Sequence, residues 1–157
     1  MVENKYLIFG FDSSWEKLTE IRAEVKNFVK NINKDLSDAA VITASELCEN
    51  AIKFGTNIST SENMRLGCEL ENNILRIIVT CGVINEKNLN DLINHINKIN
   101  TEENSLKLYV QQLMHFIKIK NSKETKLGLY RIAYESQFKI SYDLMNNTLK
   151  IIAERRI

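Results

Sequence analysis

Residues 64–80 read MRLGCELENNILRIIVT, and this stretch decides the fold class. Its first half alternates apolar and polar side chains, which is the pattern of a strand with one buried face. The apolar members are Met64, Leu66, Cys68 and Leu70. Asn72 and Asn73 then predict a tight turn, because asparagine tolerates the positive φ angles that such turns require. Residues 74–80 return as a more apolar strand, which is typical of the centre of a sheet.

The segments around this hairpin alternate between strand and helix periods. Residues 6–11 predict a first strand, and residues 138–153 predict a second hairpin that turns at Asn146-Asn147. Elsewhere apolar residues recur every three or four positions, the spacing of amphipathic helices. Such helices can cover one face of an antiparallel-rich sheet. We therefore predict an α+β fold with a single domain over residues 1–157: a two-layer α/β sandwich with a mixed, largely antiparallel sheet and helices on one face.

Polar residues before the apolar patterns predict where the helices begin. Ser13 and Glu16 match a capping box at the start of the first helix. Ser37 predicts the start of the second helix, Asn85 that of the third and Thr101 that of the fourth.

The apolar spacing predicts which side chains each helix buries. In the first helix the expected core residues are Trp15, Leu18, Ile21, Val25, Phe28 and Ile32. In the fourth they are Leu106, Tyr109, Val110, Leu113, Met114 and Ile117. The second helix is expected to end at Gly55, where glycine accommodates a left-handed residue.

Composition excludes several classes of function. The chain has 157 residues, 44% of them apolar and 26% charged, with a net charge of +1. No strongly basic surface is therefore expected, and neither nucleic acid nor an anionic membrane is an expected partner. No apolar run reaches the roughly 20 residues of a membrane helix, so we expect a cytoplasmic protein. The three cysteines lie in apolar patterns without metal-ligand spacing and are expected to be buried free thiols.

The helix over residues 37–55 carries the most informative polar pattern. At 100° per residue, Glu46, Asn50 and Lys53 fall on one narrow stripe of this helix. One interpretation is an ordinary solvated stripe on an amphipathic helix. The other is chemical, because a carboxylate and an amide one turn apart can orient water and hold Mg²⁺, which prefers oxygen ligands.

Three segments resemble motifs of one protein superfamily. Residues 46–55, ELCENAIKFG, are similar to the N-box of the gyrase, chaperone and histidine-kinase ATPases, in the version found in anti-sigma factor serine kinases. The preceding stretch FDSSWEKLTEIR is similar to the opening of that family. Residues 126–132, KLGLYRI, resemble its second glycine box, and residues 84–100 with this box are similar to SiaB-type protein kinases. The resemblance covers nearly the whole chain.

The resemblance implies roles for residues of the N-box. Asn50 would coordinate Mg²⁺ and bind the cofactor ATP. Glu46 would be the catalytic general base, which must lie within hydrogen-bond reach of the attacking hydroxyl. Lys53 would approach phosphate oxygens, whereas Phe54 stands where the family often has histidine, so no polar role transfers there.

Both glycine boxes depart from the family pattern. In the first box, Asp-x-Gly in the family, the chain has Thr80-Cys81-Gly82. Thr80 would therefore offer adenine only a neutral acceptor, which weakens recognition by about 1–2 kcal/mol. In the second box Lys126 replaces a glycine, and Gly128 remains for close approach to phosphate. Lys126, with Lys120 and Lys123, would supply positive charge to the bound phosphates in place of the lost glycine; the alternative is a solvated lysine-rich loop.

The resemblance implies a bacterial regulator of the partner-switching kind. Such a protein binds Mg²⁺ and ATP and either phosphorylates a serine on a small antagonist protein or sequesters a sigma factor. A homodimer is also compatible with this resemblance. Intact Glu46 and Asn50 favour this protein serine kinase, while Thr80 and Lys126 favour an ATP-blind adaptor that acts through protein–protein contacts. A third alternative is an unrelated sheet-and-helix module with a fortuitous N-box, since fold does not fix function.

Overall fold

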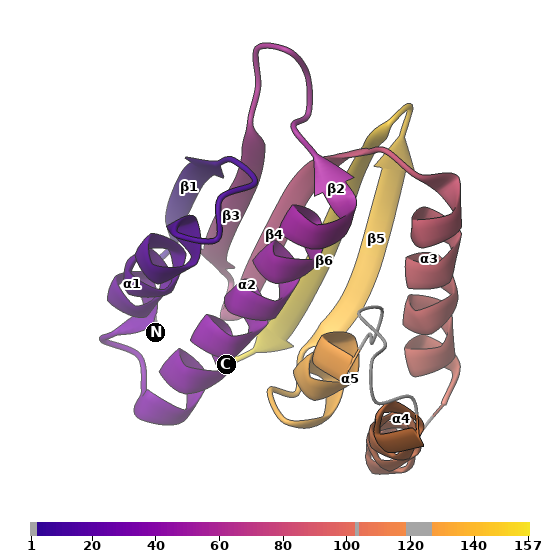
Figure 1. The fold of residues 1–157 in the computed structure, drawn as a ribbon. Helices are drawn as coiled ribbons and strands as arrows, with labels where there is room; N and C mark the ends of the chain where they lie inside the picture. The colour runs from indigo at the N-terminus through magenta and orange to yellow at the C-terminus, as the bar shows by residue number, and fades with distance from the viewer. Residues whose placement is uncertain (1–2, 103, 119–126) are drawn as a thin grey trace.

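The computed structural model describes residues 3–102, 104–118 and 127–157. Their helices and strands follow one another along the chain as Figure 1 shows. In order they are β1 (Lys5–Phe11), α1 (Lys17–Val29), α2 (Lys34–Phe54), β2 (Gly55–Thr56), β3 (Met64–Glu71), β4 (Ile74–Val83), α3 (Glu86–Thr101), α4 (Ser105–Lys118), α5 (Leu127–Tyr134), β5 (Lys139–Met145) and β6 (Thr148–Arg156). Among the described residues, no helix is long and apolar enough to cross a membrane.

The strands form one sheet in the order β1-β3-β4-β6-β5, and the short β2 pairs with β4. Every pairing between these strands is antiparallel. The helices lie on one side of the sheet, with α2 across its middle (Figure 1). The predicted α+β sandwich with helices on one face is confirmed.

Alternation along the strands places the core between the sheet and the helices. In β3 the residues at positions 64, 66, 68 and 70 are buried and their neighbours are partly exposed, as the sequence predicts. The turn between β3 and β4 also has the predicted geometry, because Asn72 and Asn73 have φ angles of 54° and 63°. Asn146, in the turn between β5 and β6, has a φ of 57°.

Helix starts were predicted less well than strands. Helix α1 begins at Lys17 without a side-chain cap, so the predicted capping box at Ser13 is wrong. Helix α2 is capped by Asn33, whose Oδ1 accepts a hydrogen bond from the amide of Leu36 at 2.7 Å. Ser37 is therefore inside the helix rather than at its start. Asn85 caps α3 as predicted.

The predicted fourth helix differs in start and in burial. Helix α3 continues through Thr101, and α4 begins at Ser105. Leu106, Val110 and Met114 were expected to face the core, but all three are exposed. Among the side chains of α4 that the structure describes, the buried apolar one is Leu108. Because Leu106, Val110 and Met114 are four residues apart, they form one apolar stripe, which we call the α4 stripe.

Two further expectations in the N-terminal half are wrong. Trp15 lies on the surface, and the centroid of its ring is 5.8 Å from the Lys53 Nζ. The core residues expected at positions 18, 21, 25 and 28 are buried. Gly55 is extended rather than left-handed, with φ −105° and ψ −175°. Glycine is needed there because an added Cβ would lie 2.8 Å from both the Ala51 carbonyl oxygen and the Cys81 Sγ.

Candidate functional site

The candidate site lies around α2, which carries the residues that resemble an N-box. The apolar residues at positions 40, 44, 47, 48 and 51 are buried against the sheet, as the sequence predicts. Helices α1 and α5 lie on either side of α2 (Figure 1). The polar residues of α2 are thereby divided among three environments: the α1 side, the α5 side and a small cavity towards α3.

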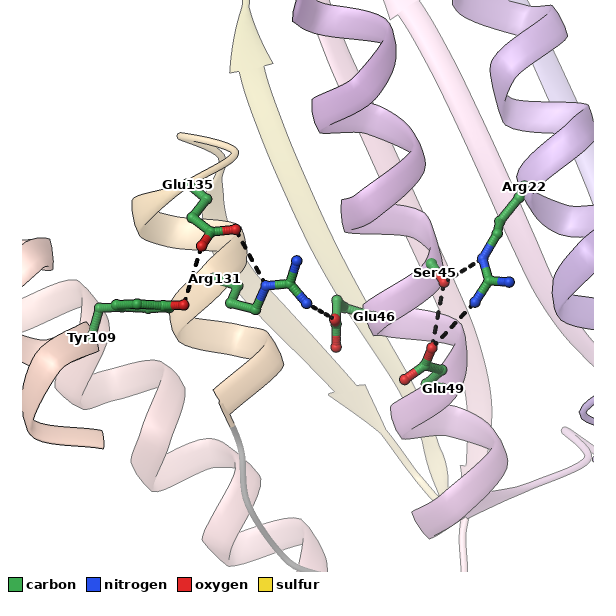
Figure 2. Close-up of polar contacts among 7 residues, drawn as sticks. All are labelled: Arg22, Ser45, Glu46, Glu49, Tyr109, Arg131 and Glu135. Atoms are coloured by element: carbon green, nitrogen blue, oxygen red, sulfur yellow. Dashed lines mark hydrogen bonds and ion pairs between the residues drawn. The ribbon is translucent and has the colours of Figure 1, made fainter. Parts of the chain in front are cut away.

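On the α5 side, Glu46 is held by an arginine that sequence analysis did not single out. Arg131 Nη1 donates a hydrogen bond to Glu46 Oε1 at 3.0 Å. Arg131 Nε also donates to Glu135 Oε2 at 3.3 Å, and Tyr109 Oη donates to the other oxygen of Glu135 at 3.1 Å. Figure 2 shows this chain of contacts running from α4 through α5 to α2. The i,i+4 spacing of Arg131 and Glu135 was the only signal of it in the sequence.

Gly128 lies directly against the same carboxylate. A Cβ added at Gly128 would lie 2.1 Å from Glu46 Oε2 and 3.0 Å from its Cδ, so a side chain there would clash. Residue 128 of the segment 126–132 therefore lies against Glu46 of the segment 46–55. Gly128 makes room for the Glu46 carboxylate, and this packing is enough to explain why glycine occupies position 128.

Burial sets the protonation behaviour of Glu46. Its side chain is 19% exposed, and loss of water raises the pKa of the carboxyl above its ordinary value. The neighbouring Glu49 raises the pKa further, and the cations of Arg131, Lys53 and Arg22 lower it without cancelling the rise. A raised pKa suits a general base, but one carboxylate oxygen is bonded to Arg131 and the other abuts Gly128.

On the α1 side, a second polar cluster ties α2 to its neighbour. Arg22 Nε donates to Ser45 Oγ at 3.0 Å, and Arg22 Nη2 lies 3.5 Å from Glu49 Oε1 (Figure 2). These contacts join α1 to α2. The cluster is therefore accounted for by packing between two helices.

Asn50 faces a cavity between α2, α3 and the ends of β4 and β6. The cavity has a volume of about 30 Å³, and its walls are mainly apolar. They are formed by Asn50, Ala51, Phe54, Gly55, Cys81, Gly82, Val83, Asn85, Asn88, Leu89, Leu92, Leu149 and Ile151. The Nδ2 of Asn50 is buried and has no hydrogen-bond partner among the described residues. Asn50 is thus the predicted site residue whose surroundings best suit a ligand.

The first glycine box enters this cavity with a different side chain from the one predicted. Cys81 lines the cavity, and successive side chains of a strand point to opposite faces. Thr80 therefore points to the helix-free face, where it pairs with Arg65 of β3 and Lys150 of β6. The arrangement gives no support to the predicted contact between Thr80 and adenine.

Gly82 lines the cavity as well, but its lack of a side chain has a structural cause. It pairs with Thr56 of β2, and an added Cβ would lie 2.4 Å from the Asn57 carbonyl oxygen. The close approach of this backbone segment requires glycine at position 82. The retained glycine of the first box is therefore explained by packing.

Lys53 does not reach the cavity. Lys53 is not among the residues that line it, and its ammonium group lies over the Trp15 ring. Lys126 lies outside the described residues. Glu46 and Gly128 meet each other but are absent from the described cavity wall.

These residues fit Mg²⁺ and ATP poorly. A cavity of about 30 Å³ is about a tenth of the smallest ordinary ligand pocket. Within the described ranges, no group of three or more histidine, cysteine, aspartate or glutamate side chains could hold a metal ion. Of the predicted site residues that the structure describes, Asn50 and Gly82 line the cavity, and Asn50 alone brings a polar side chain to it. No family model and no curated protein sequence matches the chain.

Proposed function

We propose that this chain is a signalling regulator that acts by binding a protein partner and has lost phosphoryl transfer. The observation that carries the proposal is the state of Glu46. Its carboxylate is bonded to Arg131 at 3.0 Å and packed against Gly128, where a general base needs a free lone pair directed at the substrate hydroxyl. The apolar cavity wall and the position of Thr80 support the same conclusion.

The α4 stripe is the surface that best suits a protein partner. Leu106, Val110 and Met114 are 47%, 43% and 56% exposed, and together they form one apolar face of an amphipathic helix. Apolar residues spaced in this way are the usual contacts when a helix packs into the groove of another protein. On the same helix Tyr109 bonds to Glu135, so the stripe adjoins the contacts that hold Glu46. A small antagonist protein or a sigma factor is the class of partner that the resemblance implies.

Thermal unfolding with and without Mg²⁺ and ATP tests the loss of nucleotide binding. A ligand that binds only the native state at 1,000 times its dissociation constant adds about 4 kcal/mol of stability. We expect no shift in the melting temperature at millimolar nucleotide. A clear shift, or transfer of labelled phosphate to a serine of an antagonist protein, would contradict the proposal.

Titration with purified antagonist proteins and sigma factors tests the partner surface. Val110→Glu should weaken complex formation at least tenfold, because it places a charge at the centre of the apolar stripe. Gln111→Glu is a matched control, since Gln111 is an exposed neighbour on the same helix. Equal binding by both variants would exclude the α4 stripe as the contact surface.

The magnesium-dependent kinase is a second candidate because of Asn50. Its buried Nδ2 has no partner among the described residues, so a bound ligand would give it one. If nucleotide binds, Asn50→Ala should abolish magnesium-dependent binding while the free energy of unfolding changes little, because no hydrogen bond of that Nδ2 is lost. Nucleotide binding that survives this substitution would remove the N-box from the explanation.

A further inference from the structure

Strand β1 is an edge of the sheet, and one row of its backbone groups points away from β3. On the β6 side of β4, Val83 N donates to Asn147 O at 2.9 Å, so the odd positions of β4 bond to that side. In an antiparallel sheet the N–H and C=O of a residue bond to the same neighbour, and successive residues bond to opposite neighbours. The even positions of β4 therefore bond to β3, and the odd positions of β1 bond to β3 from the other side. Tyr6, Ile8 and Gly10 thus direct their backbone groups outward.

These outward groups are not bonded within the part of the chain that the structure describes. No hydrogen bond joins the backbone of Tyr6, Ile8 or Gly10 to another described residue. The opposite edge is different, because Asn100 Nδ2 of α3 donates to the outward carbonyl of Ile140 in β5 at 3.0 Å. Helix α3 lies beside β5, whereas no helix caps the edge of β1 in this way (Figure 1). Of the two edges, β1 is therefore the open one.

Strand β1 also lacks the features that usually keep an edge strand from pairing. It pairs with β3 residue for residue from Lys5 to Phe11, so it contains no bulge. Positions 6–11 carry neither proline nor a charged side chain, and these are the residues that natural edge strands use to block an added strand. Tyr6 and Ile8 are 60% and 75% exposed on the helix-free face. An uncharged edge of this kind is suited to receive another strand.

We infer that β1 binds an extended segment of a protein partner, which joins the sheet as a further strand. Each outward residue offers one N–H and one C=O, and an extended backbone presents acceptors and donors at the matching spacing. In this mode of recognition the main-chain bonds supply affinity and alternate side chains supply specificity. The site goes beyond the proposed function, because β1 lies on one side of α2 and the α4 stripe on the other (Figure 1).

An apolar residue is expected in the partner segment opposite Ile8. On its other side Ile8 pairs with Gly67, which has no side chain to cover it. The atoms nearest to a Cβ added at Gly67 are all 3.9 Å away, so the space above this glycine is open. An apolar side chain from the partner segment would bury Ile8, and removal of this surface from water favours binding.

A basic residue is expected in the partner segment opposite Tyr6. Tyr6 pairs with Glu69, and Glu71 follows on the same face of β3. The cation opposite Glu69, Arg76 of β4, is engaged elsewhere, because its Nε lies 3.1 Å from Glu154 Oε2. The partner backbone would lie two strand spacings from β3, about 10 Å, which a lysine and a glutamate side chain span together. Charge complementarity therefore favours a segment with a basic residue two positions from an apolar one.

Amide hydrogen exchange measured by NMR tests whether the edge is open. In the free protein the amides of Tyr6, Ile8 and Gly10 should exchange freely, whereas those of Leu7 and Phe9, which face β3, should be protected. Protection of the first three amides at every protein concentration would mean that the chain covers its own edge. Protection that grows with concentration would mean that a second copy covers it. Either result overturns the inference.

Selection of a phage-displayed library of ten-residue peptides on the purified protein tests the occupant. We expect enrichment of peptides with a basic residue two positions from an apolar one. Ile8→Pro should weaken their binding about tenfold, because the proline ring replaces the central outward donor, while the ladder to β3 is kept. Ile8→Thr is the matched control, since it retains the amide and the β-branched shape, and it should keep most of the binding. No enrichment, or equal binding by Ile8→Pro and the wild type, overturns the inference.

Methylation of the peptide amides, one at a time, makes the same test on the unmodified protein. Methyl groups at alternate positions should abolish binding and those at the intervening positions should leave it, because only every second amide faces β1. Methylation without this alternation overturns the added strand. The peptides should bind the Val110→Glu variant as strongly as the wild type, so that this inference and the α4 stripe fail independently.

A charge exchange tests the basic residue. Glu69→Lys should weaken binding of the selected peptides about fivefold, because it replaces an attraction by a repulsion at an exposed site. Peptides in which the basic residue is exchanged for glutamate should bind this variant better than they bind the wild type. Binding that is insensitive to Glu69→Lys overturns the assignment of a basic segment.

Discussion

Gly128→Ala should break the contact between α5 and α2 that holds Glu46. The new Cβ would lie 2.1 Å from Glu46 Oε2, so the carboxylate must retreat by roughly 1.3 Å to reach an ordinary contact. The 3.0 Å bond from Arg131 to Glu46 would then exceed hydrogen-bonding distance. A hydrogen bond to a charged group contributes about 1.5–3 kcal/mol, and solvent exposure of Arg131 places this one at the lower end.

Part of that loss is offset by the helix itself. Alanine favours a helix over glycine by roughly 0.5–1 kcal/mol, and position 128 lies in α5. The net expectation is a loss of about 1 kcal/mol. In a Glu46→Ala background the sign should reverse, because the nearest remaining atom is the Cβ of residue 46 at 3.5 Å, an ordinary contact. There Gly128→Ala should be neutral or stabilising.

Urea unfolding of the four proteins in this double-mutant cycle measures the coupling directly. We expect a coupling energy of about 2 kcal/mol, well above the scatter of additive sites. Gly67→Ala serves as the control glycine, since the atoms nearest to its added Cβ are all 3.9 Å away. An equal loss of stability from Gly128→Ala in both backgrounds would refute the reasoning, because the clash would then not involve the Glu46 carboxylate.

Three further predictions concern the strands, the carboxylate and the thiols. Gly82→Ala should lower the free energy of unfolding in urea by about 1–3 kcal/mol, because its Cβ would meet the Asn57 backbone, which cannot rotate away as a side chain would. A loss no larger than that of Gly67→Ala would contradict this prediction. The pKa of Glu46 is raised above 4.5 in the folded state. The free energy of unfolding of the wild type, relative to that of Glu46→Gln, should therefore fall as pH rises through 4.5 and level off above the raised pKa. A rise of this difference with pH would mean that the ion pair with Arg131 outweighs burial. Burial also raises the pKa of Cys81 to about 11, and all three thiols should react with a disulfide reagent only as fast as the chain opens; rapid labelling of native protein would disprove this.

The sequence alone predicted the hairpin at residues 64–80 and a sheet with one buried face. The alternation through residues 64–70 and the two asparagines at the turn are local signals, and a strand has only two faces. The tight turn therefore pairs β3 with β4, and the buried face sets which of their side chains point to the core, in agreement with the observed register. The core side of α2 was predictable for the same reason, because a period of 3.6 leaves one apolar face.

Local signals were weaker at the helix ends and in α4. Serine and asparagine are both favourable caps, so the sequence analysis predicted a start at Ser37, whereas the structure begins the helix after Asn33. The apolar spacing of α4 was correct, but spacing does not say whether a partner face exists. In the structure the stripe at Leu106, Val110 and Met114 remains exposed.

The candidate site was decided by tertiary structure. Glu46 and Arg131 are 85 positions apart, and no local pattern predicts that their side chains meet. The motif spacing identified the right helix, but strand register decided that Cys81 rather than Thr80 faces the cavity. The same register places Arg65 and Lys150 beside Thr80 on the helix-free face. Sequence periodicity determines which side chains share a face, whereas only the pairing of distant segments determines which faces and charges come together.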